Sequence, residues 1–539
     1  TDTTGGYQRG NYATLNPLMN RDGQSITLAD GNLSFTSAAS SGNYGTRVNT
    51  IGVTSGKWYA EFTVEVVGNG IFIGITRDPD GDSNHIGAHA TSYGYLTNGQ
   101  KYNNNSGSSY GDSYTAGDVI SIAMDLDNDT VAFYKNGVSQ GTAYSSLAAS
   151  TYFMGISGAV NAAVVANFGQ MRFKYPMPSG YAALNTTALP AATIADGSAY
   201  FDVDTYSGTN ATLERSNFSF QPDLLWFKAR SYSGSHALVD SVRGISKQLS
   251  SNLTNAESTN TGGAGPQSFD SDGFTLGTES NATGSTNGSQ TYVAWAWDAG
   301  SSTVSNTDGS VTSSVRANPS AGFSIVKYSL TGQSAQTIGH GLNSSLGLLI
   351  TKATGTTNGW AIWHSAFSNT QGIALTDGTV GTQTWWDQSN MTNSVFAHKA
   401  GTTSSQGGDI IAYCFAPVSG FSAFGEYDAN GSSDGPFIYT GFQVKWLMIK
   451  GAGYTSNWNI FDTARDTDNP AIQQLRANLS SAEQSNTSGN SAILVDLLSN
   501  GFKLRAGAGS ANDVNQSGQS YIYAAFAENP FQANGGLAR

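Results

Sequence analysis

The chain has 539 residues, a formal net charge of −13 and only 12% charged residues. Its length indicates roughly three to five domains, and the lack of a basic run in the sequence argues against nucleic-acid binding through phosphate neutralisation. No apolar run approaches the ~20 residues that a membrane-spanning helix needs. The single cysteine, Cys414, excludes an internal disulfide framework, and we expect it to be a small buried residue.

Residues 1–185 have the sequence pattern of a β-sandwich. Short apolar or alternating segments, such as 58–64, 71–75 and 119–124, are separated by turns rich in Gly, Asn and Asp. These turn residues tolerate the positive φ angles that tight hairpins require. Many short strands joined by such turns are typical of a sandwich.

Four segments of this unit resemble the SPRY domain and follow one another in the family's order. They are residues 56–59, 70–75, 125–137 and 167–170. The resemblance implies a concanavalin-like sandwich of two sheets that binds partners through loops at one end, and it implies no catalysis. Residues 11–18 are also similar to the entry of SPRY-like domains in phage structural proteins.

The rest of the chain divides into two linkers and three β modules. Residues 186–198 and 301–321 are rich in Ala, Ser, Thr and Asn and lack periodicity, so we interpret them as linkers. The modules then cover 199–300, 322–420 and 421–539, the last with a C-terminal tail.

Three segments recur in these modules at matching places, which indicates one β unit written three times. The first ends in a lysine, the second ends at the same separation from that lysine, and the third ends in an aromatic residue. Large and small residues alternate along the third segment, as expected for a central strand buried on both faces. The corresponding columns are Lys228/Lys352/Lys450, Asp240/His364/Asp462 and Trp297/Phe415/Phe526.

Two further expectations concern single positions in the modules. The lysine column is interpreted as strand-end charges with packed stems and ammonium groups in water, with a shared ligand contact as the alternative. A short helix is predicted over 471–479, because Ile472, Leu475 and Leu479 would share a face, with a weaker counterpart at 246–249. Whether the modules form a solenoid, beads on linkers or a pseudo-threefold ring stays open.

Aromatic residues among Gly, Ser and Asn are the candidate ligand contacts, because flat rings beside amides suit the faces of sugars. For the tyrosines, the alternatives are closure of the sandwich end or a subunit interface. For the tryptophan pair, core packing, subunit contact and ligand binding are equally open. The candidates are Tyr93, Tyr95, Tyr102, Tyr110 and Tyr114 in the first unit and Trp385 and Trp386 in the second module.

Metal binding and catalysis have little support in the sequence. Asp78, Asp80 and Asp82 alternate as in calcium loops, but the Gly and distal Glu of an EF-hand are missing, so acid-rich turn formation is the favoured interpretation. The sequence has no nucleophile elbow, zinc-protease motif or phosphate-binding loop. At the Asp240/His364/Asp462 position the residue type differs between modules, whereas the apolar residues around it recur. We therefore expect no enzymatic activity, no metal and no cofactor.

The C-terminal segment 526–531 resembles the end of structural proteins of marine phages, and the three modules resemble a domain of unknown function found in such proteins. The resemblance implies a non-enzymatic virion protein, most simply a tail fibre or receptor-binding protein that contacts host-surface glycans. Expected partners are other virion proteins, a host glycan or receptor, and further copies of the chain, three if it is a fibre; neither nucleic acid nor membrane insertion is expected. The alternatives are a capsid decoration or head fibre, a tailspike-type polysaccharide depolymerase, and a secreted adhesin with an export signal upstream of Thr1.

Overall fold

The protein is almost entirely built from β-strands. A computed structural model describes residues 10–19, 24–38, 42–78, 84–278, 288–331, 334–368, 371–376, 381–382, 385–399, 408–485, 495–505 and 513–531. Over these ranges it contains two short 3-10 helices and no α-helix, which confirms the expected all-β class. In the same ranges, no helix is long and apolar enough to cross a membrane.

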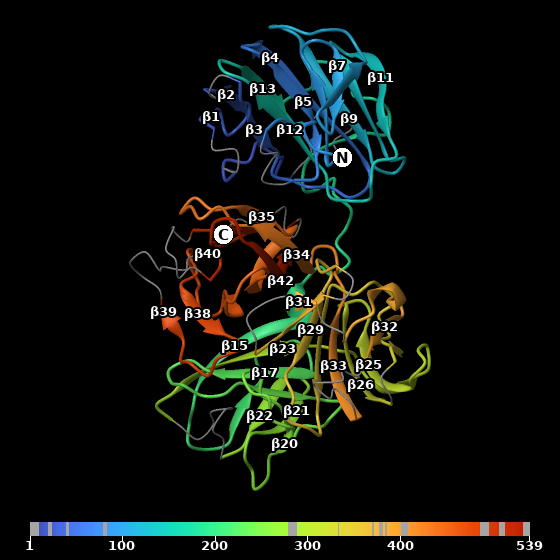
Figure 1. The fold of residues 1–539 in the computed structure, drawn as a ribbon. Helices are drawn as coiled ribbons and strands as arrows, with labels where there is room; N and C mark the ends of the chain where they lie inside the picture. Colours follow the sequence, from blue (N-terminus) through green and yellow to red (C-terminus); the bar gives the residue numbers. More distant parts are fainter. Residues whose placement is uncertain are drawn as a thin grey trace.

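The first unit is a sandwich of two antiparallel sheets (Figure 1, blue to cyan). Its strands are β1 (Ile26–Ala29), β2 (Ser34–Ser37), β3 (Gly45–Val48), β4 (Lys57–Val66), β5 (Ile71–Thr76), β6 (Ser92–Leu96), β7 (Gln100–Asn103), β8 (Ser106–Ser109), β9 (Val119–Asp125), β10 (Thr130–Lys135), β11 (Val138–Ser145), β12 (Phe153–Gly158), β13 (Ala163–Asn167) and β14 (Ala182–Ala183). One sheet has the order β1-β2-β13-β4-β9-β10-β11, with β14 parallel to β4, and the other has the order β3-β12-β5-β6-β7-β8. Alternate residues of both sheets, such as Phe62, Ile73 and Ile122, are fully buried between them.

The remaining strands form three larger sheets, each accompanied by small ones. The first module contains η1 (Gly197–Ala199), β15 (Phe201–Ser207), β16 (Leu213–Arg215), β17 (Leu224–Ala229), β18 (Ala237–Asp240), β19 (Lys247–Gln248), β20 (Ser258–Thr259), β21 (Pro266–Asp270), β22 (Gly273–Leu276) and β23 (Thr291–Trp297). The second contains β24 (Thr303–Asn306), β25 (Ser313–Asn318), β26 (Phe323–Leu330), β27 (Gln336–Gly339), β28 (Leu348–Ala353), β29 (Ala361–His364), β30 (Gln371–Ala374), β31 (Gly381–Thr382), η2 (Gln388–Asn390), β32 (Val395–His398) and β33 (Gly408–Phe415). The third contains β34 (Ser422–Asp428), β35 (Phe437–Tyr439), β36 (Phe442–Gly451), β37 (Asn459–Asp462), β38 (Gln473–Arg476), β39 (Gln484–Ser485), β40 (Val495–Leu498), β41 (Gly501–Leu504) and β42 (Ser520–Pro530).

The three larger sheets have the same central path. Their consecutive neighbours are β15-β23-β17-β18, β26-β33-β28-β29 and β34-β42-β36-β37. The register also agrees, since the aromatic residue near the end of each closing strand faces the corresponding residue of the next strand in the sheet. These pairs are Leu224 with Trp297, Leu348 with Phe415, and Trp446 with Phe526. The predicted central strands β23, β33 and β42 thus lie between two neighbours, and Cys414 on β33 is fully buried as expected.

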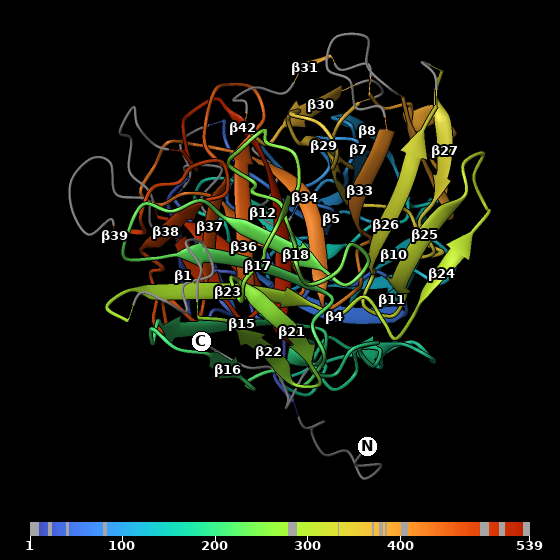
Figure 2. The same cartoon turned by 90° about the horizontal axis from the view of Figure 1, so that it is seen from below.

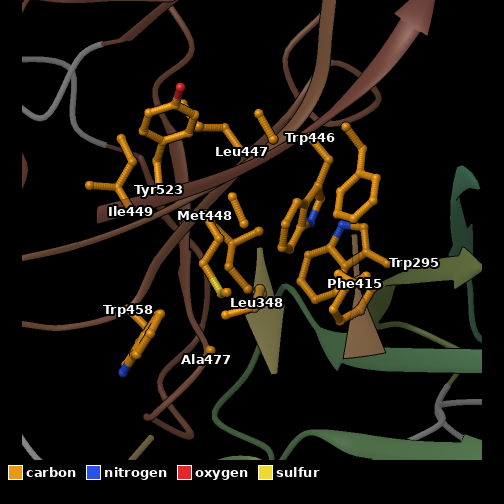
Figure 3. Close-up of a cluster of buried hydrophobic side chains, with 14 of the residues drawn as sticks. Trp295, Leu348, Phe415, Trp446, Leu447, Met448, Ile449, Trp458, Ala477 and Tyr523 are labelled. Carbon is orange, nitrogen blue, oxygen red and sulfur yellow. The ribbon is translucent and has the colours of Figure 1, made fainter. Parts of the chain in front are cut away.

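The three sheets surround one shared hydrophobic core (Figures 2 and 3). At its centre the rings of Trp297, Phe415 and Phe526 contact one another pairwise, with centroid distances of 6.2 Å, 5.8 Å and 5.7 Å. Because every module contributes to this contact, the modules close around a common axis rather than extending as beads or a solenoid. The outer face of each large sheet packs against a small sheet of its own module, β16-β22-β21, β27-β32 or β35-β41-β40.

The first unit rests directly on the third module (Figure 1). The Tyr439 hydroxyl donates to the carbonyl of Gly52 at 3.2 Å, and its ring lies edge-on to Phe153 with a centroid distance of 5.0 Å. Asn500 Nδ2 donates to the carbonyl of Thr50 at 3.0 Å, and Lys503 Nζ donates to that of Leu18 at 2.6 Å. These contacts attach the sandwich to the third module in addition to the covalent connection through residues 186–198.

Two sequence predictions about local structure are wrong. The helix predicted over 471–479 is replaced by the strand β38, in which Leu475 pairs with Ile460 of β37 and is buried. Its proposed counterpart at 246–249 contains β19, which pairs with β20 in a separate two-stranded sheet, while Leu249 forms a single bridge to Leu238 of β18, so neither segment is helical. Pairing with a neighbouring strand buries Leu475 in the shared core, and that tertiary contact outweighs the helical spacing of the apolar residues.

The segment 301–321 is not a bare linker, because it contains β24 and β25. Val315 of β25 pairs with Val326 of β26, and β24 continues the sheet outward. The second module therefore has two strands that precede the common path. Residues 186–198, which the structure describes in full, contain no strand.

Candidate functional site

The lysine column lies inside the protein, so the expectation of ammonium groups in water is wrong. Lys228, Lys352 and Lys450 are all fully buried. Each Nζ donates to the carbonyl of the following residue, at 2.9 Å, 2.7 Å and 2.9 Å respectively. A second acceptor completes each site: the Ser480 carbonyl, the Thr356 carbonyl and the Ser456 hydroxyl. Burial lowers the pKa of all three lysines to about 8.

This burial predicts that the protein becomes more stable as the pH rises from about 8 to about 9.5. A lysine with a folded-state pKa of about 8 binds its proton less tightly than in the unfolded chain, where the pKa is about 10.4. Its contribution to stability is fully present above the unfolded pKa and is lost as the pH falls through the folded pKa. We expect a gain on the order of 1 kcal/mol per lysine over this interval, measured by urea unfolding. A Lys352→Met variant should lose its share of the slope, whereas a fall in stability over this range would contradict the assignment.

The variable column Asp240/His364/Asp462 joins neighbouring modules. Asp240 accepts a hydrogen bond from the Tyr413 hydroxyl at 2.9 Å, and Asp462 accepts one from Trp295 Nε1 at 3.0 Å. His364 Nε2 lies 3.1 Å from the carbonyl of Tyr523. Each contact therefore crosses from one module to the next around the axis, first to second, third to first, and second to third.

Both aspartates of this column carry buried ion pairs. Asp240 lies 2.5 Å from Arg243 Nε, and Asp462 lies 2.6 Å from Arg465 Nε. Burial opposes the charge of Arg465, but Asp462 and Glu483 outweigh it and raise its pKa. Both carboxylates are fully buried and ion-paired with arginine. They therefore have a structural role and are not accessible as an acid or a base.

The candidate tyrosines lie on β6, on β7 and in the segment between β8 and β9. Tyr95 and Tyr114 belong to its core, and the Tyr114 hydroxyl donates to the carbonyls of Ile71 and Tyr95, each at 2.8 Å. The other three are half-buried: Tyr93 and Tyr110 pack against the core, and Tyr102 lies edge-on to Phe72. Four of the five thus pack in or against the sandwich core, whereas Tyr102 contacts Phe72 and His85 outside that core cluster.

The tryptophan pair lies in the outer layer of the second module. Trp386 is buried and stacks on His398, with ring centroids 4.7 Å apart. Trp385 is half-buried and packs against the same outer cluster, which includes Trp363. The pair thus helps to cover the outer face of the large sheet, next to η2.

A pocket of about 200 Å³ opens beside this layer. Trp363 comes from β29, Val395 from β32, and Gln388 from η2, while the remaining residues come from the turns before β28 and after η2. Two polar atoms of the lining are buried and have no hydrogen-bond partner within the described part of the chain: Trp363 Nε1 and Gln388 Oε1. The full lining is Ser345, Leu346, Trp363, Gln388, Met391, Thr392 and Val395.

A larger cleft of about 580 Å³ lies where the first unit, the connection 186–198 and the third module meet. Its aromatic residues are Phe424, Tyr439 and Phe531, and hydroxyls come from residues such as Thr54 and Thr151. The described residues that line it include no charged side chain. Both cavities are therefore suited to uncharged ligands.

No metal site emerges from the described ranges, where no group of three or more potential ligands from His, Cys, Asp and Glu comes together. Asp78 is described, whereas Asp80 and Asp82 lie outside the described residues. The interpretation of this segment as an acid-rich turn rather than a calcium loop therefore stays a prediction.

Comparison with known families assigns both parts of the chain. The family model for a domain of unknown function, DUF7483, matches residues 196–530, and the SPRY domain model matches residues 57–171. The chain belongs to the DUF7483 family. The DUF7483 region spans all three modules, and the SPRY region covers most strands of the first sandwich, which confirms the SPRY resemblance.

Several known proteins are similar to about a quarter of this DUF7483 protein. The E3 ubiquitin-protein ligase RKP of Arabidopsis thaliana is 32% identical over 130 residues, which are 23% of this chain and 10% of the ligase. The ATP-dependent RNA helicase Ddx1 of Drosophila melanogaster is 32% identical over 141 residues, 26% of this chain and 19% of the helicase. The chain thus spans less than a fifth of the length of either relative. The crystal structure of the SPRY domain of human HERC1 is 25% identical, with a TM-score of 0.25, and covers 28% of this chain and 96% of that chain.

Proposed function

We propose that this protein is a non-enzymatic structural protein of a bacteriophage particle, a tail fibre or receptor-binding protein that contacts glycans on the host surface. It lies on the outside of the virion, binds other virion proteins and associates with further copies of itself, three if it forms a fibre. The observation that carries the proposal is the SPRY domain held by direct contacts on a closed three-module body. A binding domain on a compact support suits a protein that presents a surface to an external partner.

In this proposal the three modules are copies of one β unit. The equal strand paths, the equal register at Trp297, Phe415 and Phe526, and the three buried lysines support it. The polar residue at the Asp240/His364/Asp462 position differs between the modules. A catalytic group would have to be kept at a defined position, so this repetition favours a structural role over catalysis.

The chemistry of the cavities supports adhesion to neutral glycans more than cleavage of polysaccharides. Glycoside hydrolysis uses two carboxylates that face each other across the scissile bond. The described residues that line the two cavities above include no Asp or Glu, whereas Asp240 and Asp462 are buried in ion pairs. Hydroxyls, amides and aromatic rings remain to contact a ligand, and these groups suit sugars.

A binding and cleavage assay tests this function. Immobilised neutral polysaccharides from the host surface should retain the full chain, and incubation with the soluble polysaccharide should release no reducing ends. Release of reducing ends in proportion to protein concentration would replace adhesion by depolymerisation. Failure to bind any polysaccharide of the host surface would remove the glycan from the proposal.

A further inference from the structure

The cleft of about 580 Å³ lies between two parts of the chain that are fixed to each other. Residues 186–198 link the first unit to the modules, and part of this connection lines the cleft (Figure 1). The Tyr439 hydroxyl donates to the carbonyl of Gly52 at 3.2 Å, and both residues belong to the lining. The cleft is therefore pre-formed by the fold, as is usual for ligand sites at domain interfaces.

Exposed hydroxyl groups enter the cleft lining from three segments of the chain. Thr54 belongs to the first unit, Thr193 to the connection, and Ser419 to the turn between the second and third modules. Their side chains form no hydrogen bond with another residue in the described part of the chain. A hydroxyl both donates and accepts, so each can exchange its water for a polar group of a ligand.

The aromatic residues of the lining all come from the third module and stay partly exposed. Phe424 lies on β34, Tyr439 on β35, and Phe531 directly follows β42. Each of them is half-buried, so a ligand in the cleft can reach part of each ring. Sugars present C–H faces that pack on aromatic rings and hydroxyls that bond to polar groups. The lining offers both kinds of contact.

The geometry points to this cleft as the binding site of a neutral oligosaccharide, which packs on the three aromatic residues and bonds to the three exposed hydroxyls. The inference rests on the proposed function and gives the adhesion a site and a ligand class. The described lining includes no charged side chain, which disfavours phosphates, carboxylates and cations. The volume lies within the ~300–1,000 Å³ typical of ligand pockets, so it suits a short run of sugar rings.

Titration calorimetry of the full chain with tetrasaccharides tests the site. The neutral probes are maltotetraose, cellotetraose, laminaritetraose and N-acetylchitotetraose, and tetragalacturonic acid is the charged comparison. We expect at least one neutral probe to bind and the charged one not to bind. Absence of binding by every neutral probe, or equal binding of tetragalacturonic acid, would overturn the inference.

Narrowing the cleft gives a variant with a matched control. Ala191 and Ala195 are both exposed on the same connection, but only Ala191 lines the cleft. Ala191→Leu should weaken tetrasaccharide binding at least tenfold, because the larger side chain takes up space that alanine leaves open. Ala195→Leu should bind like the unmodified protein. Equal affinity of the two variants would place the ligand elsewhere and contradict the site.

Removing one ring tests the aromatic contact. Phe531→Leu keeps an apolar side chain without the ring and should weaken binding about tenfold. Phe173→Leu is the control, because Phe173 is also half-buried but lies outside the cleft, edge-on to Tyr59. An equal loss of affinity in both variants would show that the effect does not come from the cleft.

The immobilised polysaccharide separates this inference from the proposed function. If the surface retains Ala191→Leu as strongly as the unmodified chain, adhesion stands but the cleft is not its site. If a tetrasaccharide binds in the cleft but the surface retains nothing, the site stands and adhesion to the host surface fails. If neither binds, both fail.

Discussion

Replacing Trp297 by alanine should destabilise all three modules at once, by about 3–5 kcal/mol. Trp297 lies at the centre of the shared core, where its ring contacts Phe415 of the second module and Phe526 of the third. Its Nε1 has no hydrogen-bond partner among the described residues, so the substitution removes packing and leaves no polar group stranded. The stability lost is therefore the cost of opening a large cavity where three sheets meet.

Hydrogen exchange read separately for each module, together with urea unfolding, measures this effect. Slowly exchanging amides in β23, β33 and β42 should all become less protected, because the three closing strands share one core. Val304→Ala is a control, since Val304 is 56% exposed on β24 and its truncation should cost little. Loss of protection confined to the first module would mean that the modules fold independently and that the common core contributes little.

Breaking the buried ion pair of the third module should cost about 3–5 kcal/mol, because the buried guanidinium is then left with Glu483 alone, which is shared with Arg230. In Asp462→Ala the guanidinium of Arg465 loses its contact at 2.6 Å and keeps Glu483 at 3.0 Å. The indole N–H of Trp295 also loses its acceptor, so the hydrogen bond between the first and third modules is lost.

The second module supplies the matched variant for this prediction. It carries His364 and Phe367 where the third module carries Asp462 and Arg465. The double substitution Asp462→His with Arg465→Phe removes both charges together and should cost less than Asp462→Ala alone. Chemical unfolding of the three proteins at neutral pH measures the difference. A loss below about 1 kcal/mol for Asp462→Ala would show that solvent reaches the pair and that its burial is not maintained.

Sequence patterns predicted the central strands of the modules better than the contacts of their buried polar residues. The alternation of large and small residues before Trp297, Phe415 and Phe526 correctly predicted central strands, because strand burial imposes a period of two on the sequence. The recurrence of the aromatic column also corresponds to equal register in the three sheets. The closed arrangement was not predictable, since contacts between modules leave no periodic signal.

The lysines and the pocket show where local patterns fail. A lysine after an apolar strand suggests an exposed strand end, yet backbone carbonyls and Ser456 satisfy the buried ammonium groups. Trp363 and Gln388 lie on separate segments, and only the fold brings them to one cavity. One signal was available: among the equivalent positions Val239, Trp363 and Phe461, only the second module carries a polar hydrogen-bonding group.

Electron cryo-microscopy of intact virions of the kind in which we propose that this protein resides tests the central claim most directly. We expect density for the three closed modules with the SPRY domain on the third module, projecting from the tail or shell. Purified particles that lack this polypeptide, by density and by mass spectrometry, would contradict the account.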